Sequence, residues 1–206
     1  MLPSFTSVLS TTKDLEVFLG KIKYKLLNNP TEGSIKLAEV LEELSLILEF
    51  IEKETVRYLE IIFLSDKSNF IQCRSALLSL ESGYLSIKGY EARGHCHKII
   101  NIYEKHLDHW FSKILDRQEA QEVKWLFERI NSADGDMIEG IDEITRWLML
   151  ESETILQMVD TDQLDAANQK IKDARIAVQQ TRREIVSALA RMKLLEASLI
   201  VSFQAV

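Results

Sequence analysis

Proline is almost missing from this chain of 206 residues, which contains only Pro3 and Pro30 and has none from Thr31 to Val206. Proline interrupts helix interiors and favours turns, so a proline-free run of this length favours long helices joined by short connections. Glycine is also scarce, with seven residues in the whole chain. We therefore predict an all-α fold without a β-sheet.

Cysteine is equally rare, and Cys73 and Cys96 are too few for a disulfide framework in a chain of this size. The N-terminal segment lacks the basic stretch and the cleavage-site pattern of a secretory signal. No apolar stretch reaches the roughly 18–20 residues that are needed to span a bilayer. We expect a cytoplasmic protein with reduced thiols, and we do not expect it to be embedded in a membrane.

The chain has fewer basic than acidic residues, with 25 Lys and Arg against 32 Asp and Glu, which gives a net charge of -7. Nucleic acids and anionic lipid surfaces both attract basic faces, so this balance argues against either as a partner. Hydrophobic residues make up 46% of the chain and charged residues 28%. This composition suits a folded chain with a sizeable core and a charged surface.

Apolar residues at helical spacing, with turn residues between them, divide the chain into a series of predicted helices. Asp116 with Glu119 resembles a capping box that opens one of them, and three close glycines predict a kink or turn within Gly89–Gly94. The clearest loop is 131–135, a possible weak boundary in what we otherwise expect to be a single domain, 1–206. The expected helices cover about 4–27, 34–64, 69–115 (continuous or broken within 89–94), 117–130, 136–159 and 162–203.

The C-terminal helix carries the strongest pattern in the chain. Apolar residues at strict spacing seven are typical of coiled-coil packing, and small residues three positions later permit a close approach by a neighbouring helix. We therefore predict an elongated antiparallel bundle of five to six helices with a long heptad-patterned C-terminal helix. Its predicted interaction seam consists of Leu164, Ile171, Val178, Ile185, Met192 and Leu199.

The four histidines all lie between His95 and His109. His106 and His109 are one helical turn apart, close enough to share a metal ion, so they are the candidate metal ligands. No acidic residue precedes a histidine by three positions, as helical di-iron sites require. Apolar residues share the same stripe, so we expect His106 to pack at the edge of the core, with the metal site as the alternative. Cys96 is not expected to be a reactive thiol.

The motifs of nucleotide-binding loops, nucleophile elbows and paired cysteine sites are all missing, so the sequence predicts neither a cofactor nor a catalytic centre. We expect a non-enzymatic interaction or scaffold module that binds a protein partner or associates with itself. One alternative is an enzyme or ligand binder of small molecules or metals that uses the His95–His109 region. A second alternative is a bundle that acts at membranes through the apolar segment Leu195–Val206.

Overall fold

The computed structural model describes residues 6–28, 31–64, 74–75, 77–78, 84–131 and 136–204, which contain helices and turns but no strand. The predicted all-α fold is therefore confirmed. None of the described helices combines the length and the apolar character that a bilayer span requires. The elements are α1 (Thr6–Leu27), α2 (Glu32–Leu64), α4 (Tyr84–Ile102), the π-helix η1 (Tyr103–Leu107), α5 (Asp108–Ile114), α6 (Arg117–Asn131), α7 (Asp136–Asp160) and α8 (Leu164–Gln204).

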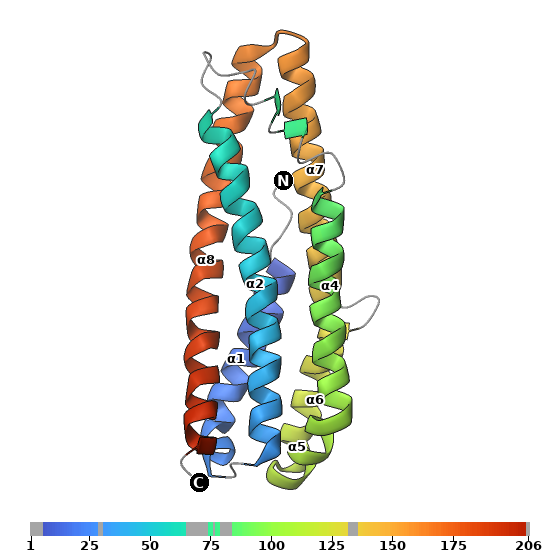
Figure 1. Ribbon diagram of the computed structural model, residues 1–206, viewed down its shortest axis with the longest axis vertical. Helices are drawn as coiled ribbons and strands as arrows, with labels where there is room; N and C mark the ends of the chain where they lie inside the picture. The colour runs from blue at the N-terminus through green and yellow to red at the C-terminus, as the bar shows by residue number, and fades with distance from the viewer. Residues whose placement is uncertain are drawn as a thin grey trace.

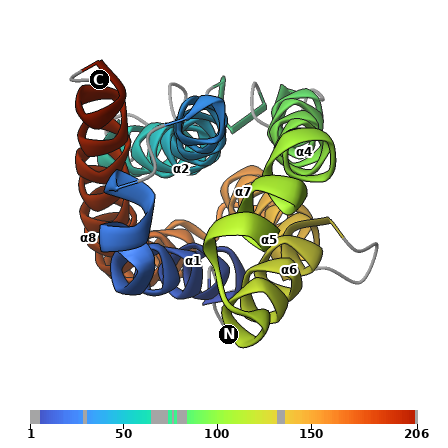
Figure 2. The same ribbon diagram turned by 90° about the horizontal axis from the view of Figure 1, so that it is seen from below.

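The bundle is elongated, and its two longest helices, α2 and α8, run antiparallel along its length (Figure 1). At 1.5 Å per residue the 41 residues of α8 make a rod of about 60 Å. α4 packs on α2, while α6 and α7 follow one another from the lower to the upper half. Seen from below, α8, α2, α4, α6 and α1 surround the lower half of the bundle (Figure 2).

The core forms because each long helix has one apolar face and turns it inward. On α2, the residues at spacing seven are all buried, with Leu37, Leu44 and Tyr58 at 0% exposure and Ile51 at 1%. The same cluster of buried side chains draws members from all the long helices described above. The face of α2 that carries these residues at spacing seven is thus the side that faces the core.

Two helix ends form as local sequence chemistry dictates. Asp116 Oδ1 accepts hydrogen bonds from the backbone N–H groups of Gln118 and Glu119, and Glu119 Oε2 accepts one from the N–H of Asp116 at 3.1 Å. This confirms the predicted capping box at the start of α6. α7 ends with Asp162 at φ 59°, where the Asp162 and Gln163 N–H groups donate to the Val159 and Met158 carbonyls. These bonds form a Schellman motif that turns the chain into α8.

The kink or turn predicted within Gly89–Gly94 is wrong, because α4 runs as an unbroken α-helix from Tyr84 to Ile102. A Cβ at Gly89 would stand 2.9 Å from Thr145 Oγ1, so the glycine allows α4 and α7 to pack closely. That packing offsets the helix propensity that glycine lacks. The predicted break at 65–68, the helix start near 69, Cys73 and most of the 131–135 loop lie outside the described residues.

Candidate functional site

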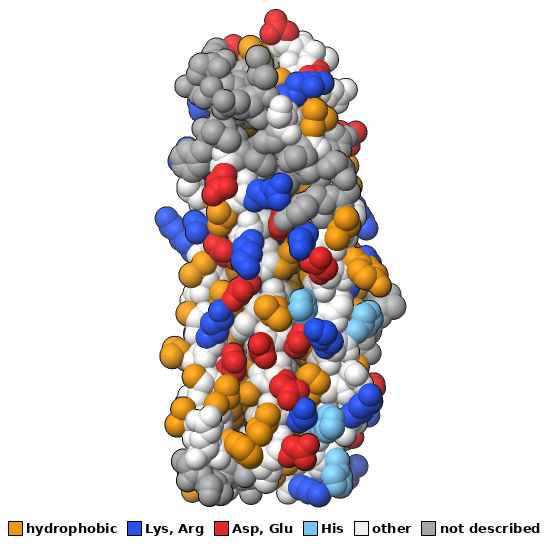
Figure 3. Space-filling view, viewed as in Figure 1, with side chains coloured by type: hydrophobic (Ala, Val, Ile, Leu, Met, Phe, Trp, Pro, Cys, Tyr) orange, Lys and Arg blue, Asp and Glu red, His pale blue; other side chains and the backbone are white. Residues whose placement is uncertain are grey.

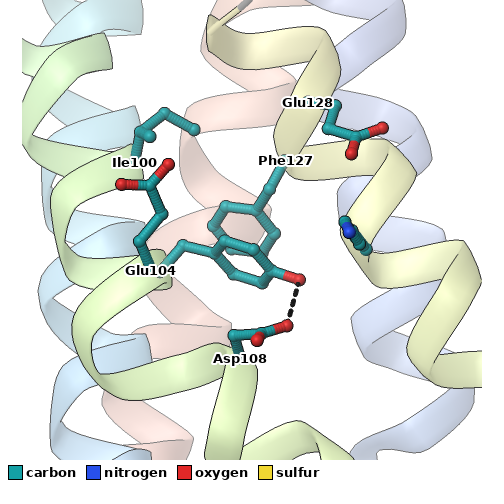
Figure 4. A pocket seen from close by; sticks show the side chains of 7 residues that line it. Ile100, Glu104, Asp108, Phe127 and Glu128 are labelled. Atoms are coloured by element: carbon teal, nitrogen blue, oxygen red, sulfur yellow. Dashed lines mark hydrogen bonds between the residues drawn. The ribbon is translucent and has the colours of Figure 1, made fainter.

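A pocket of about 260 Å³ opens between α6 and the point where α4 passes into η1. The carboxylates of Glu104, Asp108 and Glu128 lie around the stacked rings of Tyr103 and Phe127 (Figure 4). Ile100 and Lys124 complete the lining. The pocket lies in the region that the sequence singled out through its histidines, but no histidine lines it.

Tyr103 is held in this pocket by a ring contact and a hydrogen bond. Its ring stacks on that of Phe127, with the centroids 4.2 Å apart and the planes at 16°, and its hydroxyl donates to Asp108 Oδ1 at 3.1 Å. Burial, together with the nearby carboxylates of Asp108 and Glu128, raises the pKa of the Tyr103 hydroxyl. The phenol therefore keeps its proton at neutral pH and acts as a donor to Asp108, which counts against a role as a general base.

The two histidines proposed as metal ligands are both exposed, with His106 in η1 and His109 in α5. The expectation that His106 packs at the edge of the core is therefore wrong. The wider turn of the π-helix breaks the α-helical register on which that expectation relied, and Tyr103 and Leu107 are the buried residues of η1. Within the described residues no group of three or more His, Cys, Asp or Glu side chains could hold a metal ion.

Two other side chains of this region, those of His95 and Cys96, contribute to helix packing. His95 Nδ1 lies 2.5 Å from Glu43 Oε2, which joins α4 to α2. Cys96 is fully buried, and this burial raises the pKa of its thiol to about 12. Both the burial and the raised pKa leave little thiolate at neutral pH, which disfavours a nucleophilic role.

The predicted interaction seam of α8 is buried within the chain itself. Val178, Ile185, Met192 and Leu199 are at 0% exposure, Ile171 is at 5%, and Leu164 at the start of the helix is half-buried. α8 makes its most extensive contact with α2 and a further contact with α1. α8 also contacts α7, so the seam packs against helices of the same chain, and a partner would meet other side chains of α8.

A second apolar stripe, which the sequence analysis missed, lies on the outward face of α8. It consists of Ala190, Leu194, Ala197 and Val201, at spacings of four, three and four, and all are exposed. At about 100° per residue these four lie in a narrow sector opposite the buried Met192. We call them the outer stripe. Their coiled-coil spacing is visible in the sequence, but the sequence does not say which of two apolar faces the bundle covers.

Beside the outer stripe, a groove of about 430 Å³ runs between α2 and α8. Its polar walls are mainly acidic, and Lys193 donates to Glu49 across it. Figure 3 shows hydrophobic side chains gathered over the lower part of α8 and the adjoining α2, with acidic side chains beside them. The lining consists of Glu42, Ser45, Leu46 and Glu49 from α2 and of Lys193, Glu196, Ala197 and Ile200 from α8.

The apolar C-terminal segment has some side chains in the core and others exposed at the surface. Leu195 and Leu199 pack into the core, whereas Ile200 is 40% exposed and Val201 is 65% exposed. One side of the segment therefore docks on the bundle while the other faces outward.

Comparisons of the chain with protein-family models, with curated proteins and with solved structures give no match.

Proposed function

We propose that this chain is a non-enzymatic protein-binding module of the cytoplasm, which docks a helix of another protein along the outer stripe of α8. The observation that carries this proposal is the exposed heptad-like spacing of Ala190, Leu194, Ala197 and Val201. A partner helix binds such a surface with its own apolar residues at spacings of three and four, as in coiled-coil and helix-in-groove recognition.

The outer stripe has the composition that a docking face needs. Leu194 is 70% exposed and Val201 is 65% exposed, so both have a large apolar area to bury. The two alanines between them allow the partner backbone to approach closely. α8 presents these residues on a rod already fixed by α2, so little conformational entropy is lost from this side when a partner binds.

Another protein fits this surface better than a second copy of the chain. A second copy carries the same net charge of -7 and the same acidic groove beside its stripe. Like charges would then meet near the contact, which disfavours self-association. The same acidic groove disfavours an anionic membrane as the occupant.

The test uses a double variant, Leu194→Asp with Val201→Asp, and a control, Leu150→Asp with Ile87→Asp, on α7 and α4. The control residues are also exposed, at 54% and 62%, but they lie outside the stripe. Circular dichroism first establishes that both variants keep the helical content of the parent chain. We expect a partner captured by the parent chain, once purified, to bind the control normally and the stripe variant at least about tenfold more weakly in calorimetry.

Two results would contradict the proposal. One is equal binding of that purified partner by the stripe variant and the control. The other is a concentration-dependent dimer in sedimentation velocity that the stripe variant abolishes, which would show that a second copy occupies the surface.

A second candidate function is the binding of a small organic cation in the Tyr103 pocket. It is favoured by the three carboxylates that lie around the aromatic pair of Tyr103 and Phe127, since ammonium groups bind carboxylates and aromatic faces. A native mass spectrum of the purified chain tests it, because a bound small molecule adds its mass. Loss of that added mass in Glu128→Gln would support the pocket, and a bare chain mass would count against it.

A further inference from the structure

We infer that the helix docked on α8 is basic, and that one of its Lys or Arg side chains enters the α2–α8 groove between Glu42 and Glu196. This inference rests on the proposed function and adds the chemistry of the partner to it. It depends on three features of the groove, all within the described residues: two carboxylates without a hydrogen bond or salt bridge, a buried hydroxyl without a hydrogen bond, and an apolar floor.

The first feature is the pair of carboxylates. The negative charge of Glu49 is already compensated, because Lys193 donates a hydrogen bond to it and Lys53 Nζ lies 3.7 Å from its carboxylate. Within the described part of the chain, Glu42 and Glu196 take part in neither a hydrogen bond nor a salt bridge, while the charge of Lys193 acts on Glu196 from a longer distance. Glu196 is half-buried, and burial, with the charge of Glu42 as the next cause, raises its pKa. Two such carboxylates favour a cation that enters between them.

The second feature is Ser45, which lies on the α2 wall of the same groove. It is 3% exposed, and within the described residues its hydroxyl oxygen has no hydrogen-bond partner. A buried polar atom without a partner is unfavourable, and a donor that reaches it removes this cost. An ammonium or guanidinium group carries only donors, which match the acceptor carboxylates and this acceptor oxygen.

The third feature is the apolar floor, which consists of Leu46, Ala197 and Ile200. Leu46 is 37% exposed and Ile200 is 40% exposed. Lysine and arginine bury their aliphatic stems along such surfaces while the charged head stays among polar groups. Because Ala197 belongs both to the groove and to the outer stripe, one helix can cover the stripe and place a basic side chain in the groove.

The test uses two synthetic amphipathic peptides of about 20 residues, long enough to span about 30 Å as a helix. Both have leucine at the a and d heptad positions. One has arginine at the flanking positions, and the other has citrulline, the uncharged analogue of arginine, at those same positions. Binding to the full chain is measured by calorimetry at low and at physiological salt.

We expect the arginine peptide to bind the parent chain at least about tenfold more tightly than the citrulline peptide, with the advantage reduced by salt. Glu42→Gln with Glu196→Gln should remove most of this advantage. The control, Glu60→Gln with Glu153→Gln, removes the same charge from exposed positions elsewhere and should keep it. Ser45→Ala should weaken the arginine peptide more than the citrulline peptide.

The possible failures are distinguishable. If both peptides bind equally, and Leu194→Asp with Val201→Asp abolishes both, the docking surface stands and the basic partner is overturned. Glu42→Gln with Glu196→Gln and its control, Glu60→Gln with Glu153→Gln, could reduce the tighter binding of the arginine peptide equally. Overall charge rather than the groove would then be responsible, which also overturns the inference. If neither peptide binds the parent chain at about 1 mM, the proposed docking surface is overturned as well.

Discussion

Gly140 of α7 lies so close to Val8 of α1 that a Cβ at position 140 would stand 2.8 Å from Val8 Cγ2 and 3.3 Å from the Val8 backbone nitrogen. The second distance involves backbone, which cannot move aside as a side chain can. Gly140 is therefore a point at which α7 and α1 pack closely, and its missing side chain is part of the packing.

Gly140→Ala should therefore destabilise the fold by about 1–3 kcal/mol, because the added methyl group forces the two helices apart. Gly20→Ala is the matched control, since a Cβ at that position meets nothing within 4 Å. This change should stabilise the protein by about 1 kcal/mol through helix propensity alone. Urea denaturation followed by circular dichroism measures both, and a stabilising Gly140→Ala would refute the close packing.

The two apolar faces of α8 should respond differently to the same kind of truncation. Ile185 is at 0% exposure, so Ile185→Ala leaves a cavity and should destabilise the chain by about 2–5 kcal/mol. Leu194 is 70% exposed, so Leu194→Ala should change the free energy of unfolding by less than about 0.5 kcal/mol. The free energies of unfolding come from urea titration, and comparable losses in the two variants would contradict this assignment of the faces.

Glu196 and Glu49 should affect the pH dependence of stability with opposite signs. Burial, followed by the charge of Glu42, raises the pKa of Glu196 above its ordinary 4.5, so the folded chain disfavours the ionised carboxylate. Glu196→Gln should therefore stabilise the protein at pH 7, and the gain should shrink as the pH falls through the raised pKa and vanish below about 4.

For Glu49, the hydrogen bond from Lys193 lowers the pKa below 4.5, so the folded chain favours the ionised form. Glu49→Gln should destabilise the protein at pH 7, and the loss should fade as the pH falls through the lowered pKa. Denaturation curves for both variants across pH 3–7 test the two signs together. Parallel curves for parent and variants would contradict the assigned shifts.

Arg129 joins three helices, so its replacement should lower the free energy of unfolding. Its Nη1 donates to Asp14 of α1 at 2.6 Å, its Nε donates to Asp136 of α7 at 2.5 Å, and its side chain is 15% exposed. Arg129→Ala leaves two half-exposed carboxylates without this partner and should destabilise the protein by about 1–3 kcal/mol.

Arg129→Lys should recover only part of that loss, because an ammonium does not reproduce the planar fork that reaches both carboxylates. Thermal denaturation measures the series, with the exposed Arg146→Ala as the control. Full recovery by lysine would show that charge, rather than geometry, is what Arg129 supplies.

The helical fold could be predicted because its signals are local. The Asp116–Glu119 box sets the start of α6, and the spacing of Leu37, Leu44 and Ile51 sets the buried side of α2. Gly89 was misread as a break, because the compensating contact comes from Thr145, far away in the sequence. The burial predicted for His106 is wrong, because the periodicity of apolar residues does not reveal that residues 103–107 form a π-helix rather than an α-helix.

The candidate site was less predictable because it depends on which helix covers which face. The seam around Ile185 and the outer stripe around Leu194 have similar spacing, and only the bundle shows that α2 covers the first. The groove between Glu42 and Glu196 joins residues that are distant in sequence, so it exists only after α2 and α8 have paired.

That pairing has a consequence for synthesis on the ribosome. α2 ends at Leu64 and α8 ends at Gln204, so about 140 residues must be added after α2 before its partner is complete. At about 5–20 residues per second, this takes roughly 7–28 s. During that interval the apolar side of α2, with Leu44 and Ile51, emerges without its main cover. The nascent chain therefore exposes this apolar surface for seconds before α8 can cover it, which is the condition that promotes aggregation of unfinished chains.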